Sequence, residues 1–175
     1  MVNKPYHHGN LRNEMIEKGL EYIGNYGVES LSMRKLAEST GVSSAAPYAH
    51  FQNKEDFLDS VESYITDKFS KTLRKAISDC KDKNTLLLEM GISYVLFFYK
   101  NPLYYQFLFN NRHLDLDTYE PFKIYHEVAS LFFGDDRYKV TGLWALVHGL
   151  AQLASSGFIK SDDIEADIRR IIMSM

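Results

Sequence analysis

The residues best suited to polar chemistry gather in one short stretch, between Ser43 and Lys54. Small residues come first, and then Tyr48, His50 and Lys54 supply a hydroxyl, an imidazole and a positive charge. Small residues at the start of a helix let its backbone approach the major groove of DNA, and the other groups suit phosphate oxygens. The pattern therefore indicates contacts with nucleic acid. An ordinary surface helix, with Tyr48 and His50 as amphipathic packing, is the alternative interpretation.

Two short helices around a turn are expected to position these side chains. Ser32 is a suitable N-cap for the first helix, and Gly41 marks the turn because glycine accepts a positive φ. A second helix is expected to start at Ser43 or Ser44 and to end near Phe51. A helix, a glycine-containing turn and a second helix make a helix-turn-helix. The expected buried side of the first helix consists of Met33, Leu36 and Ala37.

Pro47 lies in the middle of the expected second helix, where it removes a backbone hydrogen bond unless it falls in the first turn. This predicts a helix that starts at Ser44 or has a tight first turn. Ala49 adds no polar group to that helix.

Residues 7–60 resemble the DNA-binding domain of the TetR family of transcriptional regulators. The resemblance is carried by Gly27, Ser32, Met33, Leu36, Ala37, Gly41, Val42, Ser43, Tyr48, His50, Phe51, Lys54 and Glu55. Together with the opening residues 6–12, Trp144 and the His148-Gly149 pair resemble a subgroup of this family. Ala49 stands where many relatives have a larger residue. The predicted DNA-binding residues are Arg34, Lys35, Ser43, Ser44, Ala45, Ala46, Tyr48, His50 and Lys54.

Helices are also predicted on both sides of this motif. Asn10 can cap a helix that runs to about Tyr26. Asn53 and the Asp three residues later resemble a capping box that opens a long helix, ending near Ser78. His7 and His8 would precede the first helix as an arm along the DNA backbone. No metal site is expected there, because a zinc ion needs three or four converging ligands.

The chain is predicted to be all-α, with a three-helix helix-turn-helix domain at 1–53, its motif at about 32–51, and a helical regulatory domain at 54–175. No alternating strand pattern is present. A polar break at 81–84 separates the long helix from the rest. The later helices are expected at 85–100, 102–110, 118–133, 136–156 and 162–174.

Aromatic residues are concentrated after this break, and this suggests a small-molecule effector site. Apolar walls with a few polar groups are typical of ligand pockets, and buried tyrosine hydroxyls need partners. A plain hydrophobic core is the alternative, and a lone histidine on an apolar helix is usually a core residue. The predicted ligand-binding residues are Tyr94, Phe98, Tyr105, Phe109, Trp144 and His148.

The last two predicted helices, 136–156 and 162–174, favour pairing of two chains. The first is rich in glycine, alanine and serine, which let another helix come close, and the second carries a stripe of isoleucines. TetR-like regulators pair through their two C-terminal helices. A homodimer would address both halves of a near-palindromic, double-stranded DNA operator.

The composition sets limits on the remaining functions. Hydrophobic residues make up 45% and charged residues 25% of the chain, as in a soluble globular protein. No apolar run is long enough to cross a membrane, and the single Cys80 fits a reducing cytoplasm. Residues 1–51 contain five basic and five acidic residues, so bulk charge does not indicate DNA binding.

Three functions compete for the whole chain. The first is a ligand-responsive transcriptional regulator, expected to be a repressor released by a small molecule. The second is a helical interaction protein that has lost DNA binding, which the balanced charge of the first 51 residues supports. The third is an enzyme, but no catalytic motif, cofactor motif or metal-ligand spacing is found, and pairing Cys80 with a histidine would be accidental.

Overall fold

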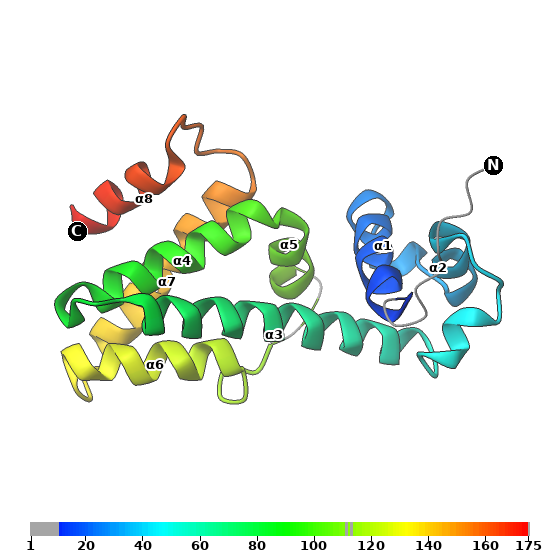
Figure 1. Ribbon diagram of the computed structural model, residues 1–175, viewed down its shortest axis with the longest axis horizontal. Helices are drawn as coiled ribbons and strands as arrows, with labels where there is room; N and C mark the ends of the chain where they lie inside the picture. The colour runs from blue at the N-terminus through cyan, green and yellow to red at the C-terminus, as the bar shows by residue number, and fades with distance from the viewer. Residues whose placement is uncertain (1–10, 111, 113, 175) are drawn as a thin grey trace. The chain divides into compact units, whose positions relative to one another are not determined.

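The computed structural model describes residues 11–110, 112 and 114–174, and within these residues it contains helices and turns but no strand (Figure 1). The all-α prediction is therefore confirmed. The chain forms two compact units, one ending at Tyr64 and one starting at Ile65. This division falls inside a helix, later than the predicted boundary after residue 53. The predicted arm with His7 and His8, and the Asn10 cap, lie outside the described residues.

The N-terminal unit consists of α1 (Leu11–Tyr26), η1 (Val28–Ser30), α2 (Met33–Thr40), η2 (Ala46–Ala49) and the start of α3 (Lys54–Asp79). The helices α1 and α2 pack against each other. Their shared core is almost free of solvent exposure, and it includes Met15, Ile16, Leu20, Leu36, Phe51, Phe57 and Val61.

The start of α3 belongs to the N-terminal unit because polar and apolar contacts join it to α1. Arg12 Nη2 donates a hydrogen bond to Ser60 Oγ at 2.8 Å, and the hydroxyl of Tyr64 donates one to Glu17 Oε1 at 2.5 Å. At its first turn, Asn53 Oδ1 accepts from the backbone N–H of Asp56 at 3.0 Å, and Asp56 Oδ2 accepts from the N–H of Gln52 at 2.7 Å. The predicted capping pair therefore forms, with the return bond one residue earlier than in a standard capping box.

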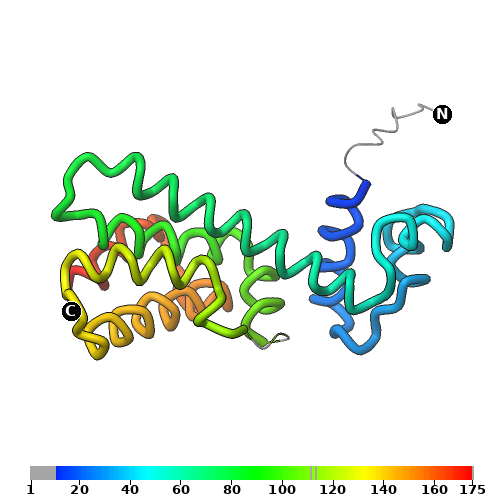
Figure 2. The backbone as a smooth tube through the Cα atoms, turned by 90° about the horizontal axis from the view of Figure 1, so that it is seen from below, coloured from blue at the N-terminus to red at the C-terminus, as the bar shows by residue number. Residues whose placement is uncertain are grey.

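The C-terminal unit contains the rest of α3, η3 (Lys83–Thr85) and five α-helices. These are α4 (Leu86–Lys100), α5 (Pro102–Asn110), α6 (Glu120–Phe133), α7 (Arg137–Ser155) and α8 (Ile164–Met173). Each lies within two residues of its predicted bounds. The helix α4 is central, because it packs against α5, α6, α7 and α8. Figure 2 shows α6 and α7 running side by side after the turn at Gly134.

Aromatic rings fill the centre of this unit. Phe69 of α3 stacks on Phe97 of α4 with ring centroids 4.9 Å apart, and it meets Tyr94 and Phe98 edge-on at 4.8 Å. Such offset and edge-to-face pairs stabilise a core by roughly 0.5–1.5 kcal/mol each beyond the burial of their area. The aromatic stretch is therefore a packed core, as one of the two interpretations of the sequence expected.

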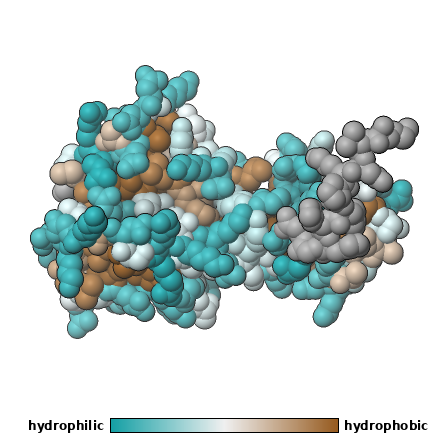
Figure 3. All heavy atoms as spheres, viewed as in Figure 1, coloured by the Kyte–Doolittle hydropathy of each residue, from teal (hydrophilic) through white to brown (hydrophobic). Residues whose placement is uncertain are grey.

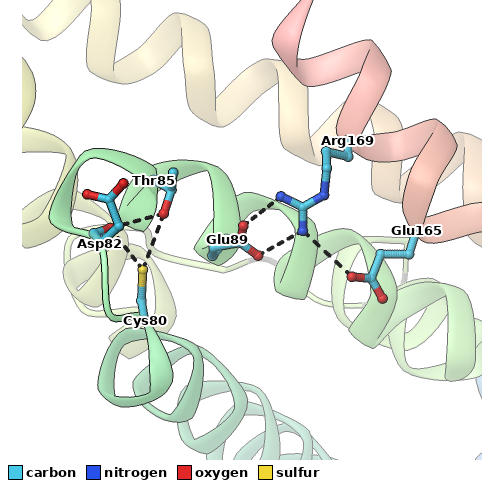
Figure 4. Close-up of polar contacts among 6 residues, drawn as sticks. All are labelled: Cys80, Asp82, Thr85, Glu89, Glu165 and Arg169. Carbon is cyan, nitrogen blue, oxygen red and sulfur yellow. Dashed lines mark hydrogen bonds and ion pairs between the residues drawn. The ribbon is translucent and has the colours of Figure 1, made fainter.

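A bidentate ion pair fixes α8 on α4. Arg169 donates two hydrogen bonds to the Glu89 carboxylate, at 2.6 and 3.0 Å, and lies 3.7 Å from Glu165 (Figure 4). Because Arg169 donates to it, the pKa of Glu89 is lowered. Ile168, also on α8, is fully buried. The Ile168 side chain and the bidentate Glu89–Arg169 ion pair thus hold α8 in place.

Candidate nucleic-acid interface and effector site

The first helix of the motif starts and ends as the sequence predicts. Ser32 Oγ accepts a hydrogen bond from the backbone N–H of Lys35 at 3.2 Å, which satisfies one free donor of the first turn. At the other end Gly41 has φ 73°, and its N–H donates to the carbonyls of Ala37 and Glu38. Met33, Leu36 and Ala37 are buried. These contacts fix where the next segment begins.

The prediction of a second α-helix from Ser43 or Ser44 to Phe51 is wrong. A turn at residues 44–45 leads into the 3-10 helix η2, which covers only Ala46–Ala49. The N–H of Ala46 donates to Ser43 O at 3.0 Å, and that of Tyr48 to Ala45 O at 3.2 Å. Pro47 has no N–H to donate, and the N–H groups on either side of it bond with the three-residue spacing of a 3-10 helix. The tight first turn inferred from Pro47 is what forms.

The predicted contact residues of this segment form one surface, which we call the recognition turn and define as residues 43–50. Ser43, Ser44, Ala45 and Tyr48 are exposed, and the Tyr48 side chain is 60% exposed. Pro47 is buried beneath them. Ala46 and His50 are half-buried, and the His50 ring lies 6.2 Å from that of Phe51. Small and hydroxyl-bearing groups are therefore presented outward together.

The three predicted cations differ in how they are held. Arg34 is exposed and pairs with Glu38 at 2.9 Å. The ammonium of Lys35 donates to Ser30 O at 2.9 Å and lies 5.6 Å from the centre of the Tyr22 ring. Lys54 is half-buried at the first residue of α3. An exposed ion pair stabilises the fold by at most about 1 kcal/mol, so a phosphate can replace Glu38 as the partner of Arg34.

The six predicted ligand-binding residues also come together. His148 is at their centre: Nδ1 lies 2.9 Å from the Tyr94 hydroxyl and Nε2 lies 3.1 Å from the Tyr105 hydroxyl. Phe109 meets the imidazole edge-on at 4.5 Å, and the Trp144 indole is stacked at 6.3 Å. The remaining member, Phe98, contacts the rings of Tyr94, Tyr105 and Phe109.

Burial sets the protonation of this cluster. It lowers the pKa of His148, because the charged imidazolium is disfavoured away from water. It raises the pKa of Tyr105 to about 12 and that of Tyr94 well above its ordinary value. At neutral pH the three groups are a neutral imidazole between two neutral phenols, and each can donate and accept hydrogen bonds.

Among the described residues, the side chains of the cluster pack against one another. The cavity beside it measures about 10 Å³ and touches the six residues only at Tyr94. One water molecule needs about 10–15 Å³ of this volume, so no organic ligand fits into this cavity without side-chain movement. A larger hollow of about 390 Å³ lies on α6, lined by Leu116, Asp117, Phe122, Lys123, His126 and Glu127. The sequence did not indicate this hollow, because Leu116 and Phe122 come from a loop and a helix, and its other residues are ordinary surface types.

Comparison with known proteins identifies the type of the N-terminal unit. Residues 15–61 match the model of the family described as bacterial regulatory proteins, tetR family. The N-terminal unit is therefore of the tetR-family type. The match covers most of α1, the helix-turn-helix and the first turns of α3, which are the elements that hold the recognition turn.

Curated relatives match this chain over part of their length. A tetracycline repressor protein of class G from Vibrio anguillarum is 35% identical over 81 residues, covering 46% of this chain and 37% of that protein. The nucleoid occlusion factor SlmA from Salmonella paratyphi A is 31% identical over 103 residues, covering 58% and 52%. The chain thus spans about half, or less, of the relatives it matches.

A solved structure extends the likeness to the whole fold. A bacterial regulatory protein in the tetR family from Rhodococcus RHA1 superposes with a TM-score of 0.74, covering 95% of each chain at 16% identity. Identity this low shows the fold alone. The C-terminal unit therefore shares an architecture with this neighbour, without an effector carried over from it.

Two positioning residues of the N-terminal unit were missed by sequence reasoning. The Arg12 guanidinium lies 5.3 Å from the centre of the Phe51 ring as well as bonding Ser60. Gly19 lies so close to Phe57 that a Cβ would be 2.3 Å from its Cζ. The signal for Gly19 was available, because a glycine on the apolar face of a helix often marks close packing.

The α7 surface offers a further candidate interface. A Cβ added at Gly142 would meet no heavy atom within 4 Å, and the same holds for Gly149. Ala145 and Leu153 are exposed on the same helix. Figure 3 also shows hydrophobic surface on the C-terminal unit over α4 and α8.

Metal-ligating groups of three or more are absent from the described residues, and no described helix is long and apolar enough to span a membrane.

Proposed function

We propose that this chain is a cytoplasmic DNA-binding transcriptional regulator, a homodimeric repressor that leaves its operator when a small molecule binds. The exposed recognition turn is the observation that carries the proposal. Its outward groups are small or hydroxyl-bearing, and Arg34, Lys35 and Lys54 lie on the adjoining helices. Ser43, Ser44 and Ala45 approach base edges, whereas Tyr48, His50 and the cations contact phosphates.

DNA retention by the purified protein tests this proposal. We expect binding to the DNA upstream of its own gene to weaken steeply between about 50 and 200 mM salt, because phosphate contacts release counterions. Tyr48→Ala combined with Lys54→Ala removes two phosphate contacts and should weaken binding at least tenfold. Intact binding by this double variant would refute the assigned residues.

A matched control separates loss of contacts from loss of fold. Tyr26→Ala combined with Lys18→Ala removes the same residue types from α1, where Tyr26 is 67% exposed and Lys18 pairs only with neighbouring Glu21 among the ion pairs of the described residues. This variant should bind DNA like the wild type. If neither variant nor wild type is retained at low salt, the chain is instead an interaction protein without DNA binding.

The homodimer is proposed to form through α7 and α8. The open glycines of α7 let a second helix approach closely, and α8 is held on α4 by the Glu89–Arg169 pair. Gly142→Arg should convert a dimer to a monomer in analytical ultracentrifugation and weaken operator binding. Ser78→Arg, on α3, should leave the dimer intact. A wild-type protein that is monomeric at micromolar concentration would overturn this part.

The effector is proposed to act on the cluster around His148. Because Trp144 is the single tryptophan of the chain and stacks on His148, its emission reports on this cluster. A ligand that prefers the conformation with low DNA affinity shifts the population away from DNA. His148→Phe should keep operator binding but lose release by the effector. Unchanged release would exclude His148 from the response.

A further inference from the structure

We infer that the hollow on α6, which we call the α6 groove, is an effector-binding site for a flat aromatic molecule without net charge. The inference depends on the proposed ligand response and names where the ligand binds. The groove is lined by Leu116 and Asp117 of the α5–α6 loop and by Phe122, Lys123, His126 and Glu127 of α6. Its volume of about 390 Å³ is within the range of small-molecule sites.

Phe122 links this groove to the aromatic cluster. It is half-buried, so part of its ring lines the groove while its edge meets the Trp144 indole at 5.0 Å. Trp144 is 8% exposed and stacks on His148. An aromatic ring seated in the groove would therefore compete with Phe122 for the indole face. Displacement of Phe122 then reaches His148 through one intervening ring.

The rest of the groove defines the chemistry of the ligand. Leu116 provides an apolar wall, and the space that the Phe122 ring vacates fits an aromatic ring of similar size. The rim carries two carboxylates, Asp117 and Glu127, and one ammonium, Lys123, so an anion and a cation each meet a repulsive group as well as an attractive one. His126 and the carboxylates supply donors and acceptors for a hydroxyl or carbonyl group. The Trp144 indole behind Phe122 is neutral and offers an ion no compensating charge.

Three benzene derivatives of one size test the ligand class. Benzyl alcohol is neutral, benzoate is an anion and benzylammonium is a cation at pH 7. Each is titrated into the DNA-free protein while Trp144 emission is recorded. We expect benzyl alcohol to change the emission and to bind at least tenfold more tightly than either ion. Equal or tighter binding of benzoate or benzylammonium would overturn the inference, as would the absence of any response to benzyl alcohol.

Variants locate the site. Leu116→Lys puts a charge on the apolar wall and should weaken benzyl alcohol binding at least fivefold. Phe122→Ala removes the ring that the ligand must displace and should strengthen it. Phe132→Ala, also on α6 but outside the groove and 39% exposed, should leave it unchanged. Unchanged binding in Leu116→Lys, or an equal change in Phe132→Ala, would place the probe elsewhere.

The readout separates this inference from the proposed function. Trp144 emission is measured without DNA. If the groove binds benzyl alcohol but the protein has no operator affinity, the inferred groove site is supported and the proposed regulator function is refuted. Operator binding that is intact while the emission titration fails would refute the groove alone.

Discussion

Gly19→Ala is the sharpest test of how the N-terminal unit is packed. In an open helix this change stabilises a protein by up to about 1 kcal/mol, because alanine has the higher helix propensity. In α1, however, the new Cβ would lie 2.3 Å from Phe57 Cζ and 3.1 Å from Leu36 Cδ1. Phe57 is fully buried and meets Phe51 edge-on at 5.1 Å, so its ring has little room to retreat. Overpacking of this kind costs about 1–3 kcal/mol, so we expect Gly19→Ala to destabilise the protein by up to about 2 kcal/mol.

Urea unfolding followed by far-UV circular dichroism measures this effect. Asn13→Ala on α1 is the control, because Asn13 is exposed and the change likewise raises helix propensity without adding a buried atom. Combining Gly19→Ala with Phe57→Leu should recover part of the lost stability, since the smaller side chain vacates the clash, and the two changes should not add. Stability equal to or above wild type for Gly19→Ala alone would show that α1 and α3 are less tightly packed than described.

Three further predictions concern caps and charges. Ser32→Ala removes the oxygen that accepts from the N–H of Lys35 and should cost about 1 kcal/mol in urea unfolding, whereas Ser32→Asp should not. Arg169 lowers the pKa of Glu89 in the folded protein. The Glu89–Arg169 pair therefore stabilises the fold above the unfolded pKa of Glu89, and this stabilisation is lost as pH falls through the lowered value. Glu89→Gln should make the loss of stability at acidic pH less steep. The pKa of His148 is lowered by burial, so the unfolded chain binds a proton first and stability should fall as pH drops below about 6.5. A thermal-melting series should show this slope in wild type and lose it in His148→Gln; the same slope in both would refute the assignment.

The helices and caps could be predicted from the sequence because their determinants are local. Ser32, Gly41 and Asn53 act within one turn of the backbone, and each does what its residue type predicts. The type of the second motif helix could not be settled in this way, since Pro47 is compatible with either an α-helix that starts late or a 3-10 turn. The hydrogen bonds of Ala46 and Tyr48 decide it.

The candidate effector site shows the limit of sequence reasoning more clearly. A concentration of aromatic residues predicts a cluster, and the cluster forms, with His148 bonded on both sides. Whether a cluster leaves space depends on how rings from several helices interlock, which no local pattern reports. Leu116 and Phe122 line the open volume instead, and they are brought together only by the path of the α5–α6 loop.

The three-residue spacing of η2 divides the recognition turn into two sets of positions. In a 3-10 helix, side chains three apart eclipse one another, so Ala45 and Tyr48 share one side while Pro47 and His50 share another. The first pair is exposed, whereas Pro47 is buried and His50 half-buried. In the proposed DNA complex, substitutions at position 45 would therefore change the base contacts and substitutions at position 48 the phosphate contacts, whereas 47 and 50 support the unit from within.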